Sequence, residues 1–221
     1  MKITRYLAGM GKMGALAALG GAFLVMAAEV MAAELEPYQV YQHKWELAQY
    51  QQTGDAQEQA LATLAAEVRN AALAHPEDLK LKTWAGIIIG SYAGAKGGLG
   101  ALGLAKEAKS DYEAVIAKDP STLNGSALTS LGVLYYRVPG WPLGFGDEEK
   151  AAFLLKRGLN FNPDGIDSNY FYADYLISQG KPAEAKPYLQ KALQAAPRPG
   201  REVADAGRQS EIQRLQQKLT E

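Results

Sequence analysis

The fold is decided by Tyr172-Ala-Asp-Tyr-Leu-Ile-Ser-Gln-Gly-Lys-Pro-Ala-Glu-Ala-Lys-Pro-Tyr-Leu-Gln-Lys-Ala-Leu-Gln-Ala-Ala-Pro197. Small and large apolar residues recur along it at helical spacing. Gly180 and Pro182 divide it, because glycine commonly ends a helix and proline commonly begins one. The alanines let two helices approach closely, and the leucines and tyrosines fill the space between their ridges. The stretch therefore predicts a helix–turn–helix unit.

The unit recurs along the chain. Four prolines, Pro76, Pro120, Pro163 and Pro197, each close an apolar stretch, at intervals of 44, 43 and 34 residues. Repeats of about 34 to 44 residues are typical of proteins built from stacked helical hairpins. The 34-residue interval has no insertion, and the two longer intervals each contain extra residues.

Counting back from each proline places the other helices and the insertions. The interval ending at Pro163 predicts helices at 126–137 and from about Asp147, with a seven-residue surplus in the loop Arg137-Val-Pro-Gly-Trp-Pro-Leu-Gly-Phe-Gly-Asp147. The interval ending at Pro120 predicts a helix at 83–93 and six extra residues in a glycine-rich turn. Weaker helices are expected at 45–52 and 56–74, before Pro76.

After Pro197 the chain breaks at Pro197-Arg-Pro-Gly200, and residues 201–220 form an amphipathic segment suited to a terminal capping helix. The positions at Tyr172–Pro197 and Leu131–Pro163 resemble the tetratricopeptide-repeat (TPR) superfamily. The expected fold is all-α: a TPR-like helical-hairpin solenoid of about nine helices, with three to four repeats, two inserted loops and the capping helix.

A narrower resemblance concerns the loop Val138-Pro-Gly-Trp-Pro-Leu-Gly-Phe-Gly-Asp147 and the segment Asn162-Pro-Asp-Gly-Ile-Asp-Ser-Asn-Tyr170. They are similar to the T-component family of periplasmic TPR proteins associated with tripartite (TRAP) transporters. That resemblance implies a periplasmic, helical protein that can form oligomers, assists a substrate-binding protein and has no catalytic residues. The chain differs from the lipoprotein members of that family because it has no anchoring Cys.

The first 33 residues have the pattern of a signal peptide. Lys2, Arg5 and Lys12 precede an apolar run at 13–28, and Ala32-Ala33 supplies the small residues of a cleavage site. The alternative is an uncleaved inner-membrane anchor at residues 13–33, although Glu29 and three glycines weaken it as a spanning helix. Residues 34–221 are expected to form a single exported, periplasmic helical domain.

Composition excludes much classical site chemistry. The 221-residue chain has no Cys, only two His (His43 and His75), and a formal net charge of −1. These counts exclude Cys-ligated metals and disulfides, and they argue against a protein that neutralises nucleic-acid phosphates. Gly98-Leu-Gly-Ala-Leu-Gly103 matches a dinucleotide-binding pattern, but a helix and not a strand is expected before it, so we expect no cofactor. With no Cys and only two isolated His, we also expect no metal site and no catalytic residues.

The inserted loop at 138–146 supplies two candidate binding residues. Three glycines and two prolines define its backbone, and Trp141 and Phe145 are its aromatic side chains. One interpretation is a rigid lip that presents both rings to a ligand or partner. The other is that both rings fold back as a plug over the superhelix.

The first helices of the repeats should line the concave face. In this register, the residues of one repeat that point inward are Thr129, Val133, Tyr136 and Arg137. The inward-pointing residues of the next repeat are Asp167, Tyr170, Asp174 and Ile177. Tyrosine, arginine and aspartate mixed with apolar residues suit recognition of a peptide or a small ligand. The alternative is a solvated polar face.

These observations favour a non-catalytic exported TPR protein that mediates protein–protein interaction through its concave groove. The expected partner is another periplasmic or envelope protein, which could be a transporter substrate-binding protein. The alternative is a periplasmic small-molecule-binding or transport accessory protein of the T-component type, with Trp141 and Phe145 at its mouth. No nucleic acid is expected to bind, and membrane contact is expected only if the N-terminal segment is not cleaved.

Overall fold

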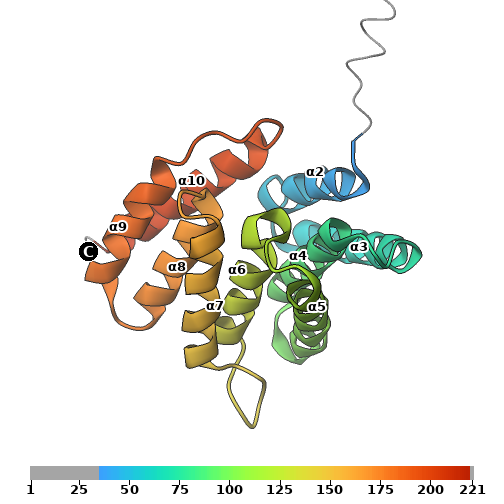
Figure 1. Ribbon diagram of the computed structural model, residues 1–221, viewed down its shortest axis with the longest axis horizontal. Helices are drawn as coiled ribbons and strands as arrows, with labels where there is room; N and C mark the ends of the chain where they lie inside the picture. Colours follow the sequence, from blue (N-terminus) through green and yellow to red (C-terminus); the bar gives the residue numbers. More distant parts are fainter. Residues whose placement is uncertain (1–34, 220–221) are drawn as a thin grey trace, which may run out of the picture. The chain divides into compact units, whose positions relative to one another are not determined.

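The computed structural model describes residues 35–219, and Pro37–Glu221 belong to one compact unit. The described part contains nine helices and no named strand, which confirms the all-α prediction (Figure 1). The helices are α2 (Pro37–Tyr50), α3 (Gly54–Ala74), α4 (Leu79–Lys96), α5 (Gly98–Lys118), α6 (Thr122–Arg137), α7 (Glu148–Phe161), α8 (Ile166–Ser178), α9 (Pro182–Leu193) and α10 (Glu202–Lys218). The predicted signal peptide, like the alternative anchor at 13–33, lies outside the described residues. Between Leu35 and Leu219, no helix is long and apolar enough to cross a membrane.

Successive helices pair into hairpins, as the proline intervals predict. α4 packs on α5, α6 on α7 and α8 on α9, and each hairpin stacks on the next (Figure 1). Leu128, Leu155, Leu189 and their neighbours are fully buried between the helices. Burial of such aliphatic side chains stabilises a fold by about 1.5–3 kcal/mol each.

The helix ends follow from local sequence. Asp147 accepts a hydrogen bond from the Lys150 backbone N–H at 3.0 Å, so α7 begins at the position predicted from the repeat. Pro182 occupies the first turn of α9, and Gly180 adopts the left-handed φ of 70° that ends the preceding helix.

The glycine-rich insertion differs from the expected loop. Gly97, with φ 62°, separates α4 from α5, and Gly98 is already the first residue of α5. The six extra residues therefore lengthen a helix, because two consecutive left-handed glycines, Gly97 and Gly98 with φ of 62° and 59°, are enough to reverse the chain. Of the two insertions, only residues 138–146 form a loop.

Several close contacts between helices are made at glycines. A Cβ atom built on Gly132 of α6 would lie 2.7 Å from Leu155 Cγ and 3.2 Å from the Leu155 backbone nitrogen of α7. Only glycine permits the two backbones to lie this close, so Gly132 sets the spacing within the α6–α7 hairpin.

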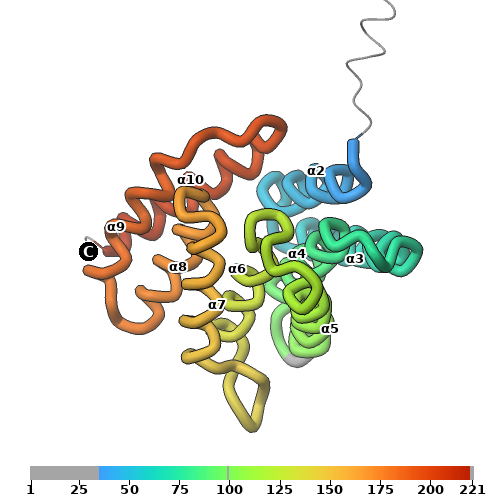
Figure 2. Tube along the Cα trace, viewed as in Figure 1, coloured from blue at the N-terminus to red at the C-terminus, as the bar shows by residue number. Residues whose placement is uncertain are grey.

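The two ends of the solenoid meet. In an open repeat array each unit contacts only its neighbours, but here α10 packs against α9, against α8 and also against α2 (Figure 2). Tyr50 of α2 packs against Gly207 of α10 so closely that a Cβ on that glycine would overlap the ring. The capping helix thus closes the described helices into a ring.

We predict that Gly132→Ala lowers the free energy of unfolding by about 1–2 kcal/mol, because overpacking at Leu155 outweighs the gain in helix propensity. Gly103→Ala in α5 is the matched control, since a Cβ there meets nothing within 4 Å. It should leave stability unchanged or raise it by up to about 1 kcal/mol. Urea unfolding of both variants tests this, and equal effects would contradict the close-approach explanation.

Candidate functional site

The ring surrounds a partly open cavity of about 1170 Å³. Its wall is formed mainly by α2, α4, α6, α8 and the segment from Arg198 into α10, with a contribution from the start of α5. The first helices of the hairpins thus face inward, as expected for a superhelix. Of the residues predicted to point inward, the cavity wall contains Thr129, Val133, Arg137, Asp167 and Tyr170.

One part of the wall is aromatic. Trp45 and Trp84 meet edge to face, with ring centroids 5.5 Å apart. The indole N–H of Trp45 donates to Ser91 Oγ at 2.9 Å, so its polar atom is satisfied. Tyr170 and Phe171 of α8 also line the cavity, with ring centroids 5.1 Å apart. This part of the wall can therefore pack apolar groups while the Trp45 N–H keeps its hydrogen bond.

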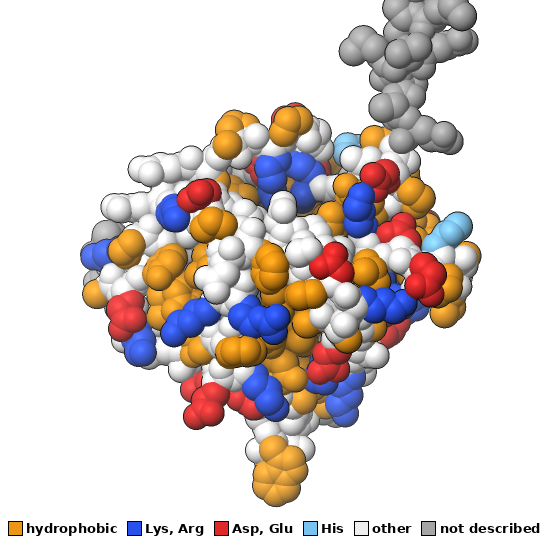
Figure 3. Space-filling model, in the orientation of Figure 1, with side chains coloured by type: hydrophobic (Ala, Val, Ile, Leu, Met, Phe, Trp, Pro, Cys, Tyr) orange, Lys and Arg blue, Asp and Glu red, His pale blue; other side chains and the backbone are white. Residues whose placement is uncertain are grey.

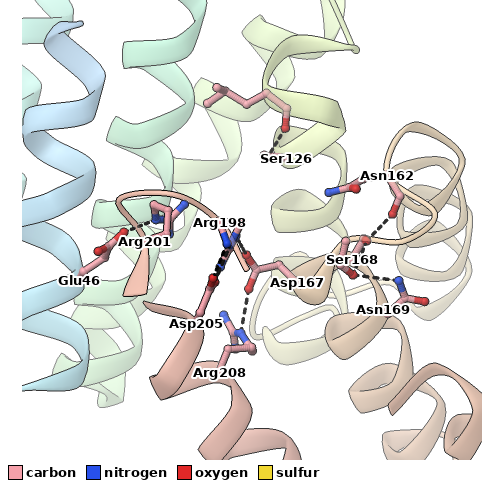
Figure 4. A network of polar contacts seen from close by, with 12 residues as sticks. Glu46, Ser126, Asn162, Asp167, Ser168, Asn169, Arg198, Arg201, Asp205 and Arg208 are labelled. Atoms are coloured by element: carbon pink, nitrogen blue, oxygen red, sulfur yellow. Dashed lines mark hydrogen bonds and ion pairs between the residues drawn. The ribbon is translucent and has the colours of Figure 1, made fainter. Parts of the chain in front are cut away.

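Another part of the wall is a network of charges centred on Asp167 (Figure 4). Its carboxylate accepts from Arg198 Nη1 at 2.7 Å and from Arg208 Nε at 2.8 Å. Arg198 also donates to Asp205 at 2.7 Å, and Arg208 donates to Glu211 at 2.5 Å. These contacts tie α8 to α10.

A second ion pair joins Arg201, the residue just before α10, to α2. Arg201 donates to Glu46, whose side chain is 1% exposed, and the pair bridges residues 155 apart in sequence (Figure 4). The Arg201 guanidinium also lies 5.3 Å from the centre of the Trp84 ring. A buried carboxylate requires such a partner, because an unpaired charge in this environment is strongly destabilising.

The pKa values of Asp167 and Arg201 are both lowered, for different reasons. Burial alone would raise the pKa of Asp167, but Arg208 and Arg198 together hold it well below its usual range. The pKa of Arg201 is lowered by burial and by nearby Arg198, although Glu46 opposes the shift. Asp167 therefore stays ionised at neutral pH and anchors the arginines.

Tyr136 and Asp174 lie elsewhere than predicted. The Tyr136 hydroxyl donates to Asp174 Oδ2 at 2.5 Å, and Arg137 Nη2 donates to the same oxygen at 2.7 Å. Of these three residues only Arg137 lines the cavity. Asp174 and Tyr136 thus hold Arg137 between α6 and α8, and burial raises the pKa of the Tyr136 hydroxyl. Tyr136 and Asp174 were expected on the cavity wall, but the structure places them behind it, where they support Arg137.

The inserted loop separates its two aromatic rings. Phe145 folds back onto Tyr135, with ring centroids 5.7 Å apart, whereas Trp141 is 90% exposed. The loop is fixed by hydrogen bonds from Asp147 N to Tyr135 O and from Gly146 N to Pro139 O, both 2.9 Å. The plug interpretation therefore describes Phe145, and the lip interpretation describes Trp141.

Three arginines of the cavity wall and the buried partner of one of them escaped the sequence reasoning. Arg198, Arg201 and Arg208 belong to a segment expected only to cap the solenoid, and Glu46 lies on the helix that matched the repeat least well. The available signal was local: three arginines within eleven positions of a terminal helix and its preceding turn. Nothing in their spacing indicated that α2 would be their neighbour.

Asp111 is a titratable group with a shifted pKa that does not join the site. Burial raises the pKa of Asp111 to about 6, but this residue is absent from the cavity wall. No cluster of three or more His, Cys, Asp or Glu residues suited to a metal ion occurs between residues 35 and 219. The groups on the cavity wall are suited to apolar packing, ion pairing and hydrogen bonding.

Comparison with known families matches residues 166–199 to the tetratricopeptide repeat. The match covers α8, α9 and the turn that leads to Arg198, which is the interval without insertion. No curated protein matches the chain. The chain thus carries a tetratricopeptide repeat within an all-α, TPR-like solenoid, a class of fold that serves protein–protein interaction.

We predict that Asp167→Asn lowers the free energy of unfolding by about 2–3 kcal/mol at neutral pH. The loss is smaller than the 3–5 kcal/mol typical of breaking a fully buried pair, because the Asp167 side chain is 35% exposed to the cavity. Since its pKa is lower in the folded state, its contribution is present above about pH 4 and is lost as the pH falls through the folded value.

Urea titrations from pH 7 to pH 3 test this, with Asp164→Asn as the control. Asp164 pairs with Lys191 at 2.9 Å, but its side chain is 82% exposed, so its loss should cost less than about 1 kcal/mol. A difference between wild type and Asp167→Asn that grows on acidification would contradict the proposed role.

Proposed function

We propose that the protein is a non-catalytic, exported interaction module that binds a segment of another envelope protein inside its ring. The observation that carries the proposal is the cavity of about 1170 Å³, bounded by the inner helices of a TPR-like solenoid. Its volume exceeds the usual 300–1,000 Å³ range of small-molecule pockets. A stretch of polypeptide fits that size better.

The chemistry of the wall supports the same partner. Tryptophan, tyrosine and arginine dominate the energetics of protein interfaces, and the wall combines Trp45, Trp84 and Tyr170 with Arg137 and Arg198. The aromatic rings supply apolar contact area. The guanidinium groups and nearby amides can bind the polar atoms of a peptide. The arginines are held in place by their carboxylate partners, so little conformational entropy remains to be lost on binding.

Export rests on the N-terminal sequence. Lys2, Arg5 and Lys12, the apolar run at 13–28 and Ala32-Ala33 are typical of a cleaved secretory signal. Cleavage would release residues 34–221 into the periplasm of a Gram-negative host. If cleavage does not occur, residues 13–33 would anchor the domain to the inner membrane, and the partner would be sought there.

A small-molecule-binding or transport accessory role, of the TRAP T-component type, is the second candidate. The observation in its favour is the contact between α10 and α2, which encloses the cavity more fully than an open groove. In that case a periplasmic substrate-binding protein would be the partner, and the cavity would hold its ligand.

We predict that Val133→Arg abolishes partner binding, because Val133 lies on the cavity wall and a guanidinium there would fill the space. The control is Phe153→Arg, at a residue that is 60% exposed and absent from the wall. Each purified variant is used as bait in an envelope extract of the native host, and the retained material is analysed by native mass spectrometry. Circular dichroism should show the same fold for both.

Retention of one polypeptide by wild type and Phe153→Arg, but not by Val133→Arg, supports the proposal. Equal retention by all three proteins contradicts it, because the cavity would then not be the binding surface. A bound species of only a few hundred daltons, lost in Val133→Arg, would favour the small-molecule candidate.

A further inference from the structure

The two insertions of the sequence lie at the same end of the molecule. One insertion lengthens α5 beside the α4–α5 turn, and the other is the loop between α6 and α7. Because these hairpins stack side by side in the same orientation, their turns must lie at a common end. Figure 2 shows the α4–α5 junction and the 138–146 loop together at that end. Both insertions contribute residues to the cavity wall, but the proposed cavity function does not explain exposed Trp141, which is absent from that wall.

The loop presents an apolar tip, which we define as Trp141, Pro142 and Leu143. Trp141 is 90% exposed and Leu143 74% exposed, and the nine residues 138–146 contain no charge. The tip forms the hydrophobic protrusion in Figure 3. It is also held in shape, because the Leu143 and Gly144 backbone N–H groups both donate to Gly140 O at 3.1 Å. An ordered, exposed Trp–Leu pair can be buried in a partner at low entropic cost.

The α4–α5 junction presents a complementary apolar recess, which we call the mouth. It consists of cavity-lining residues that are small or apolar: Gly94, Ala95, Gly98, Ala101 and Leu102. A Cβ atom built on Gly94 or Gly98 meets nothing within 4 Å, so unfilled space lies over this surface. The glycines of the insertion thus leave room for a side chain that this copy of the chain does not supply.

Leu143 connects the two features, since it belongs to the tip and also lines the cavity to which the mouth belongs. When a protrusion and a recess lie next to each other on one face, a two-fold axis beside them places each protrusion in the recess of the other copy. We propose that the protein forms a two-fold symmetric dimer in which the tip of each copy docks in the mouth of the other.

The area favours a second copy over an unrelated receptor for the tip. A tip of one tryptophan, one leucine and one proline offers on the order of 400 Å². Docked once, it would bury about 800 Å² over both partners, which is the size of a crystal-packing contact. Used twice in a symmetric dimer, it would bury about 1,600 Å², the size of a standard specific interface.

The charges near the tip favour a protein surface over an anionic membrane. Lys109 and Lys150 lie at the base of the loop, where each is neutralised by a carboxylate, Lys109 by Glu113 at 2.7 Å and Lys150 by Asp147 at 3.2 Å. Attachment to anionic lipid relies on an excess of basic residues beside the apolar group. The neutral pairs provide no such excess at the base of the loop.

Sedimentation velocity from about 1 to 200 µM tests the proposal, with Trp141→Ser at the tip, Ala101→Glu at the mouth and Phe153→Ser as the control. Wild type and Phe153→Ser, which alters a different exposed ring, should dimerise alike. Each interface variant should raise the dimer dissociation constant at least tenfold, and circular dichroism should show that both remain folded. With fluorine-labelled tryptophan, only one of the three resonances, the one lost in Trp141→Phe, should shift with concentration.

A protein that stays monomeric to 200 µM with an invariant Trp141 resonance overturns the proposal. So does a dimer that survives both Trp141→Ser and Ala101→Glu, since it would be held by another surface. Vesicles of phosphatidylcholine and phosphatidylglycerol are the third arm. A Trp141 resonance that shifts with vesicles but not with protein concentration would assign the tip to membranes and reject the dimer. Partner capture in the cavity can fail while dimerisation persists, so the two proposals are tested separately.

Discussion

The contact between the first and last described helices is the constraint on which the rest of the site depends. Repeat solenoids usually remain open, because each hairpin needs only its neighbours. Here Arg201 pairs with buried Glu46 of α2, while Arg198 and Arg208 hold Asp167 of α8. Without these contacts the inner helices would still stack, but they would border an open groove. The closed ring turns that groove into a bounded cavity.

The polar character of this closure has a physical consequence. Interfaces within the hairpins are built from alanine, leucine and tyrosine, whose burial is favourable in itself. A buried ion pair, in contrast, gains little net free energy once its desolvation is counted, although breaking it is costly. We therefore expect the α2–α10 ion pair to select one arrangement of the two ends while adding little to the free energy of unfolding. The same ion pairs place arginines on the wall of the cavity.

The hairpins could be predicted from sequence because their determinants are local. The spacing of Ala173, Ala185 and Leu189 before Pro197 is enough to place α8 and α9, and the same count located Asp147 at the start of α7. Ring closure could not be predicted, since Glu46 and Arg201 are 155 residues apart and neither stands in a repeat position. The inserted loop was intermediate: its rigidity followed from its glycines and prolines, but local sequence could not show that Phe145 turns inward and Trp141 outward.

Ring closure is tested most directly by measuring the distance between α2 and α10 in solution. The chain contains no Cys, so spin labels at His43→Cys and Gln213→Cys, both exposed positions, would be the only ones attached. Double electron–electron resonance, on labelled protein diluted with unlabelled protein, then reports the distance within one molecule. A closed ring predicts one narrow distance distribution. A broad distribution, or a second population at longer distance, would show that the ends separate and would contradict the bounded cavity.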